Sequence, residues 1–179
     1  MENFSIIIWL LPIVFMIHDF EEIIFFESWL SKNRDYLTAK FPKITKRLPF
    51  FGNFSTSAFA FAVAEEFILL SLITLFSVVF NNYLLWLAAF MGFFAHLLMH
   101  LGQWIIFRRY IPAIFTTFFA LIYCIYALYT IISNNLFQTS EIILWTIIGI
   151  VVLVPVFLLL TKLAEIFDKN ILRKKNDKQ

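Results

Sequence analysis

Five apolar stretches, each long enough to cross a lipid bilayer as a helix, constrain the fold of this chain more than any other feature. A transmembrane helix needs about 20 consecutive, mostly apolar residues, whereas a strand of a transmembrane barrel alternates polar and apolar residues. The sequence has no such alternation, so we predict an all-α fold, a five-helix transmembrane bundle. The predicted spans cover residues 4–30, 54–80, 83–107, 112–132 and 142–161.

The 14 lysines and arginines all fall in three segments that a five-helix topology places on one side of the membrane. These segments separate the first two spans, follow the third span directly, and follow the fifth. Because basic loops stay in the cytoplasm, we predict an N-terminus outside and a cytoplasmic C-terminus. The expected organisation is a multi-pass protein of the cell membrane, with one transmembrane helical domain (residues 1–168) and a basic cytoplasmic tail (residues 169–179).

The composition excludes several classes of protein. With 61% hydrophobic and 15% charged residues, the chain lies far from an average soluble domain, which is about 45–50% apolar and about 25% charged. We therefore expect the lipid bilayer as a partner and no nucleic acid, while homo-oligomerisation stays open. The one cysteine, Cys124, excludes an internal disulfide and any cysteine-cluster metal site. Residues expected as interfacial anchors near span ends are Trp29, Trp86, Trp104 and Trp145.

Three histidines and five acidic residues lie well away from the ends of the predicted spans, and no lysine or arginine lies within these spans. They are Asp19, Glu21, Glu22, Glu65, Glu66, His18, His96 and His100. At about 2.5–3.5 kcal/mol per charged group, five isolated carboxylates would cost about 12–18 kcal/mol, which is comparable to the whole stability of a domain. Each carboxylate must therefore be protonated, hydrated, hydrogen-bonded or offset by a histidinium, a metal ion or a proton.

Helical geometry brings part of this set onto one stripe of the first span. At 100° per residue, Glu21 and Glu22 flank the direction of His18, whereas Asp19 points about 100° away. The segment His18-Asp19-Phe20-Glu21-Glu22 resembles the H-x-x-E-E signature of the HXXEE family of small, mostly bacterial membrane proteins. Size and all-helical hydropathy resemble that family over most of the chain. The resemblance implies that His18, Glu21 and Glu22 act together, and it implies no particular substrate.

The second and third spans contribute at a similar depth. His96, His100 and Gln103 share one face of the third span, and Glu65 and Glu66 lie in the second. Counted at 1.5 Å per residue, the histidines and glutamates fall in a layer roughly 12–18 Å from the cytoplasmic boundary. We therefore predict one shared polar site between the first three spans, with the last two spans as scaffold.

The residue types favour a divalent metal, zinc first, with iron or manganese as alternatives. Two histidines four positions apart on one helix are a familiar bidentate arrangement. The predicted metal ligands are His18, Glu22, Glu66, His96 and His100. The predicted catalytic carboxylates are Glu21, Glu22, Glu65 and Glu66, acting toward metal-bound water. Gln103 and Asp19 are expected to support the ligands from outside.

The leading hypothesis is a metal-dependent hydrolase acting on a lipid-like or small amphipathic substrate. Three alternatives remain: a metal-free acid/base isomerase of a sterol-like or isoprenoid-like substrate, a proton-coupled or ion-coupled transporter, and a hydrogen-bonded cluster that only holds three helices together. At the cytoplasmic end, Arg108, Arg109 and Tyr110 are either a phosphate or headgroup site or a topology signal. Thr116 and Thr117 either reach the polar site or bond their own helix.

Overall fold

The computed structural model describes residues 2–46 and 55–173, and helices dominate both ranges. The element order is α1 (Glu2–Lys40), α2 (Pro42–Thr45), α3 (Thr56–Val79), α4 (Leu84–Phe107), α5 (Ile114–Ser133), α6 (Thr139–Phe167) and the π-helix η2 (Asp168–Arg173). Within the described ranges there is no strand. Five helices are long and apolar enough to cross a membrane, which confirms the predicted all-α five-helix architecture.

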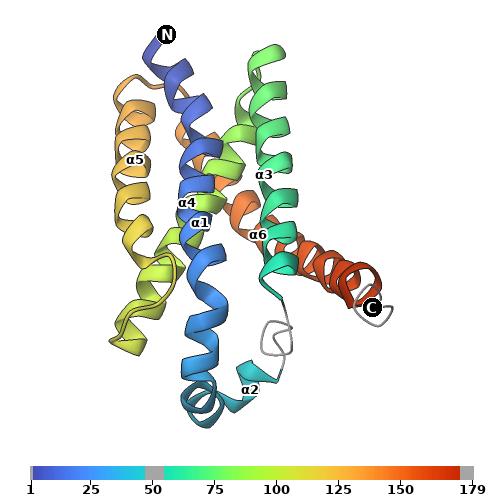
Figure 1. Ribbon diagram of the computed structural model, residues 1–179. Coiled ribbons are helices and arrows are strands. Elements are labelled where there is room, and N and C mark those ends of the chain that lie inside the picture. Colours follow the sequence, from blue (N-terminus) through green and yellow to red (C-terminus); the bar gives the residue numbers. More distant parts are fainter. Residues whose placement is uncertain (1, 47–54, 174–179) are drawn as a thin grey trace.

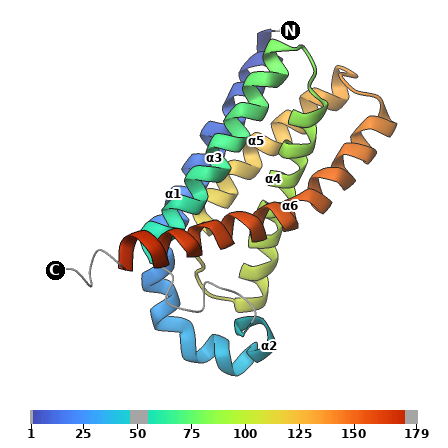
Figure 2. The same cartoon turned by 90° about the vertical axis from the view of Figure 1, so that its right-hand side faces the viewer.

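Successive long helices run in opposite directions, as Figure 1 shows. The segments that follow α1, α4 and α6 therefore lie at the same end of the bundle, and the described basic residues gather there. Figure 2 shows α6 running obliquely across α3 and α4, whereas α1, α3 and α5 lie more nearly alongside one another. Which side of a membrane the basic end faces stays a prediction.

Helix α1 is longer than its predicted span. It has 39 residues and ends at Lys40, beyond the expected boundary at residue 30. At 1.5 Å per residue it is about 58 Å long, almost twice the roughly 30 Å of a hydrocarbon core. Its last turns therefore project beyond the bundle toward α2, as Figure 1 shows.

A proline inside α1 sets one of the main contacts of the core. Pro12 has no backbone N–H, so the carbonyl of Ile8, four residues earlier, lacks its helical donor. The indole Nε1 of Trp86 donates to that carbonyl oxygen at 3.3 Å. Trp86 is fully buried and stacks on Phe90. Trp86 does lie near the start of α4, where an interfacial anchor was predicted, but its indole is buried and satisfies a carbonyl inside the bundle.

Helices α4 and α6 approach closely through glycine. A Cβ atom added to Gly149 of α6 would lie 2.1 Å from the carbonyl oxygen of Ala88, and one added to Gly92 would lie 3.3 Å from the carbonyl oxygen of Gly149. Small residues of this kind let membrane helices pack backbone to backbone. The contact holds the oblique α6 against α4, the helix that carries two of the three histidines.

Candidate metal centre

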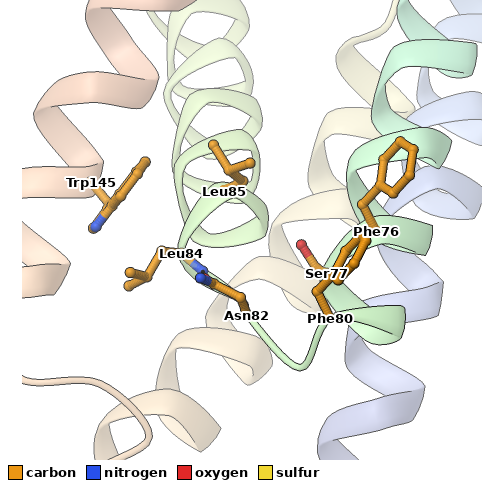
Figure 3. Close-up of a pocket in the computed structure, with 7 residues that line it drawn as sticks. All are labelled: Phe76, Ser77, Phe80, Asn82, Leu84, Leu85 and Trp145. Carbon is orange, nitrogen blue, oxygen red and sulfur yellow. Dashed lines mark hydrogen bonds between the residues drawn. The ribbon is translucent and has the colours of Figure 1, made fainter.

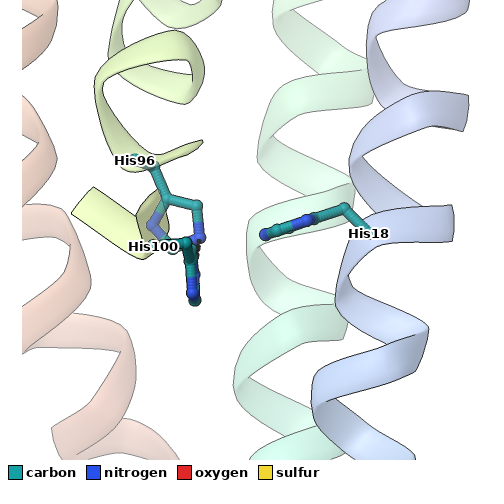
Figure 4. A group of neighbouring side chains, drawn as sticks. All are labelled: His18, His96 and His100. Carbon is teal, nitrogen blue, oxygen red and sulfur yellow. Dashed lines mark hydrogen bonds between the residues drawn. The ribbon is translucent and has the colours of Figure 1, made fainter. Parts of the chain in front are cut away.

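Three histidines from two helices meet in the middle of the bundle. His96 and His100 lie one turn apart on α4, and His18 projects toward them from α1 (Figure 4). One nitrogen of each ring lies within 4.8 Å of the others, and the Nε2 atoms of His96 and His100 are 3.0 Å apart. Zinc–nitrogen bonds of about 2.0–2.1 Å at tetrahedral angles would place ligand nitrogens roughly 3.3 Å apart. The donor set therefore fits a zinc-sized ion.

Two of these imidazoles have nitrogens that lack a protein partner. His18 Nε2 and His100 Nδ1 are buried, and neither has a hydrogen-bond partner within the described residues. A buried polar atom without a partner is costly in a protein interior. His18 itself is fully buried, so water does not reach its ring from the outside. The histidine cluster therefore contains two buried nitrogens for which the described residues provide no hydrogen-bond partner.

Thr116 on α5 lies beside both Glu21 and the His18 ring. Its hydroxyl donates to Glu21 Oε2 at 2.8 Å and lies 3.4 Å from His18 Nδ1. The carboxylate is the nearest of the acceptors around this hydroxyl, and a hydroxyl that donates to it can accept from a protonated His18 Nδ1. That arrangement favours the tautomer in which His18 Nε2 keeps its lone pair, as a metal ligand requires.

Glu22 connects the histidines to a group of acidic residues. Its Oε1 lies 3.5 Å from His100 Nε2, and both side chains are largely buried. The carboxyl groups of Asp19, Glu22 and Glu66 lie close enough to interact electrostatically with one another. Within the described part of the chain, however, the group of mutually close ligand atoms contains the three histidines alone.

The acidic residues differ in their surroundings. Asp19, predicted to point away from the stripe, is 3% exposed, and its Oδ2 has no hydrogen-bond partner among the described residues. Glu65 and Glu66 on α3 are half-buried, and Glu65 Oε2 is likewise without such a partner. Gln103, expected beside the histidines, is exposed. The structure thus brings Asp19 and Glu66 toward Glu22 and leaves Gln103 outside.

Glu21 has a different role from its neighbour Glu22. It is buried, and its Oε2 accepts both the backbone N–H and the hydroxyl of Thr116, each at 2.8 Å. Helix α5 begins after Ala113, whose φ of 67° is left-handed and whose side chain provides no cap. Glu21 therefore caps α5 from another helix, where a negative charge also complements the helix dipole.

Tyr110 completes the surroundings of Glu21. Its hydroxyl donates to Glu21 Oε1 at 2.9 Å from the loop between α4 and α5. Partial burial, followed by this hydrogen bond and the carboxylate charge, raises the pKa of Tyr110. The phenol thus stays a donor at neutral pH. We predicted the fourth span, which is α5, to be scaffold, yet Thr116 of α5 and Tyr110 supply every donor to Glu21 that the described residues provide.

A separate cavity of about 290 Å³ lies where α3, α4 and α6 meet (Figure 3). Its lining is mostly apolar and contains Phe76, Ser77, Phe80, Asn82, Leu84, Leu85 and Trp145. None of these is a predicted site residue. The cavity is therefore distinct from the histidine cluster.

Comparison with known proteins agrees with the motif. A family model described as "Protein of unknown function with HXXEE motif" matches residues 9–127, about two thirds of the chain. That range contains all of the predicted site residues. Neither the curated proteins nor the solved structures provide a match.

Proposed function

The chain belongs to the HXXEE family, and from that premise we propose that its motif helps to build a metal-dependent catalytic centre inside a membrane. His18, His96 and His100 would hold one divalent ion, with zinc favoured over iron or manganese. The observation that carries this proposal is the convergence of three imidazole nitrogens within 4.8 Å, from two helices.

The unpartnered ring nitrogens support a metal site over a cluster held together by hydrogen bonds alone. Three imidazoles can satisfy one another only in part, and His18 Nε2 and His100 Nδ1 are without partners in the described residues. A shared cation would bind the lone pair that His18 Nε2 has when the protonated Nδ1 donates to Thr116. The negative charge of the nearby carboxylates would offset the free energy of burying the cation. The predicted spans contain no lysine or arginine that could pair with these carboxylates instead.

Glu22 is the carboxylate best placed to act at this centre. It lies 3.5 Å from His100 Nε2, close enough to become a fourth ligand or to take a proton from a bound water molecule. A zinc ion held by the three histidines would supply a water molecule that ionises near neutral pH. Glu22 would accept a proton from that water and return it to the leaving group as the substrate bond breaks, and the neighbouring acids Asp19 and Glu66 interact with its carboxyl group. This chemistry is that of a hydrolase.

The surroundings indicate the class of substrate. The centre lies in helices that are long and apolar enough to span a membrane, which we propose to be the cell membrane. A substrate that reaches it must cross apolar surface, so a lipid-like or small amphipathic molecule is the proposed reactant. Such a molecule would place its polar, hydrolysable bond at the ion and its apolar part against the bilayer.

Metal content of the purified protein tests the proposal. We expect about one zinc, iron or manganese ion per chain in detergent-purified wild type and less than a tenth of that in His100→Ala. Gln103→Ala is the matched control, because Gln103 lies on α4 just beyond His100 and is exposed. Equal and negligible metal in all three proteins, after purification with added zinc, would refute a metal centre.

The row of carboxylates favours one second candidate, a proton-coupled transporter. Asp19, Glu22 and Glu66 interact across α1 and α3, and chains of intramembrane acids commonly conduct protons. This function predicts proton flux in liposomes that Glu22→Gln abolishes. An enzyme predicts no flux above that of empty liposomes, in either the wild type or the variant.

A further inference from the structure

Two basic side chains converge on a single aromatic ring at the basic end of the bundle. Lys40, at the end of α1, lies with its Nζ 5.3 Å from the ring centroid of Tyr36. Arg109, in the loop after α4, lies with its guanidinium carbon 5.4 Å from the same centroid. The two cations come from segments about 70 residues apart in the sequence, so tertiary structure brings them together.

The loop that carries Arg109 is held in place from two sides. Trp29 Nε1 donates to the carbonyl oxygen of Tyr110 at 2.8 Å, and the Tyr110 hydroxyl donates to Glu21. Both bonds tie the loop to α1. The Phe107 ring lies against Tyr36, with centroids 6.3 Å apart. Hydrogen bonds of the neighbouring Tyr110 therefore anchor the backbone next to Arg109 against α1, close to Tyr36.

The hydrogen bonds at this place leave donors for an anion. Lys40 Nζ donates to the Tyr36 hydroxyl oxygen at 2.8 Å, which leaves the hydroxyl proton of Tyr36 free to point outward. Ion pairs within the described residues involve neither Lys40 nor Arg109. The two like charges near this ring repel each other, and an anion bound by both would offset that repulsion. Ammonium, guanidinium and phenol groups together match the oxygens of a phosphate.

We propose that Lys40, Arg109 and Tyr36 bind the phosphate of an anionic phospholipid headgroup. Arg109 follows the last residue of α4 by two positions, so the group lies at the membrane end of the bundle, where headgroups are found. If the basic residues served only to set the membrane topology, they would have to lie in this loop, but Lys40 and Arg109 would not have to meet at the Tyr36 ring. The inference is independent of the metal centre.

Native mass spectrometry of lipid-exchanged protein tests the site. The protein is purified in detergent and incubated with equal amounts of dioleoyl phosphatidylglycerol and dioleoyl phosphatidylcholine. We expect wild type to retain one phosphatidylglycerol in preference to phosphatidylcholine, and the double variant Lys40→Gln/Arg109→Gln to lose that preference by about tenfold or more. Tyr36→Phe keeps the ring and removes the hydroxyl, so a loss of about threefold is expected.

The matched control is Lys162→Gln/Lys169→Gln, which removes the same charge from exposed residues near the end of α6. It should change the lipid preference by less than twofold. An equal loss in both double variants would overturn the site, because the preference would then follow net charge. Binding of inorganic phosphate in lipid-free detergent, without any preference between the two lipids, would also overturn it. The metal content of the Lys40/Arg109 variant should equal that of wild type, which separates this test from the test of the metal centre.

Discussion

Glu21 is predicted to hold two helices together, and its removal should destabilise the protein far more than a surface mutation. Glu21→Ala removes three hydrogen bonds at once, from the Thr116 N–H, the Thr116 hydroxyl and the Tyr110 hydroxyl. The two hydroxyls can turn to other acceptors, whereas the Thr116 N–H at the start of α5 is left unpaired. Hydrogen bonds to a charged group contribute about 1.5–3 kcal/mol each, so a net loss of about 3–5 kcal/mol is expected.

A conservative variant separates the hydrogen bonds from the charge. Glu21→Gln retains an oxygen for Thr116 and an amide that can donate to Tyr110, so it loses mainly the charge. We expect about 1–2 kcal/mol, from weaker hydrogen bonds and the lost interaction with the α5 dipole. For a chain of this length, about 1 kcal/mol corresponds to roughly 2–4 °C in Tm. Glu21→Ala should therefore lower the apparent Tm by about 6–20 °C and Glu21→Gln by about 2–8 °C.

The single cysteine provides the assay. Cys124 is fully buried on α5, so a thiol-reactive fluorophore labels it only as the bundle unfolds. The control is Glu165→Ala, which removes an exposed carboxylate paired with Lys169 and should shift Tm by less than about 2 °C. If Glu21→Ala shifted Tm no more than Glu165→Ala, the capping role of Glu21 would be refuted.

Four further predictions follow from other contacts. Gly149→Ala forces a Cβ against the Ala88 carbonyl and should lower the unfolding free energy by about 3 kcal/mol or more. Cys124 should then be labelled at a lower temperature. A labelling temperature equal to that of wild type would contradict the close approach of the two helices. Trp86→Phe leaves the carbonyl opposite Pro12 unpaired and should cost about 1–3 kcal/mol by the same assay. Thr116→Val removes the hydroxyl beside the His18 ring and should weaken zinc affinity about tenfold, measured by competition with a fluorescent chelator. An unchanged affinity would exclude a role of Thr116 in orienting His18. Because the pKa of Tyr110 is raised, the folded state favours the neutral phenol, and the stability of the protein should decline as the pH rises above about 10. Unfolding followed by circular dichroism should show that Tyr110→Phe removes this part of the decline.

Hydropathy was sufficient to predict the five helices, because twenty apolar residues in lipid leave the backbone few other choices. It failed at the end of α1, where Ser31 to Lys40 are too polar for a membrane span yet continue the helix. It also missed the burial of the Trp86 indole, since position near a span end does not reveal that Pro12 frees a carbonyl for it. These differences arise from contacts between helices, which a hydropathy pattern does not contain.

The candidate site was predictable wherever one helix determines the geometry. The one-turn spacing of His96 and His100 places both on one face, and the rings lie with centroids 4.6 Å apart. Contacts between helices were harder to predict: Thr116 gave no signal beyond its type, and its bond to Glu21 depends on where α5 begins. Asp19 was expected to point away because only its own helix was considered; α3 places Glu66 beside it.

Gln103 illustrates the limit of the helical wheel. It has nearly the same direction on α4 as His96, seven positions earlier, yet it is exposed while His100 is buried. Direction around a helix therefore predicts a shared face, but the depth at which neighbouring helices cover that face decides which residues meet.

X-ray absorption at the zinc edge of the zinc-loaded protein shows whether the three histidines bind one ion. We predict a first shell of about three imidazole nitrogens and one or two oxygens at roughly 2.0–2.1 Å, reduced to two imidazoles or lost in His18→Gln. A shell made only of oxygen, or a spectrum of loosely bound zinc that is the same in His18→Gln, would contradict a centre built by His18, His96 and His100.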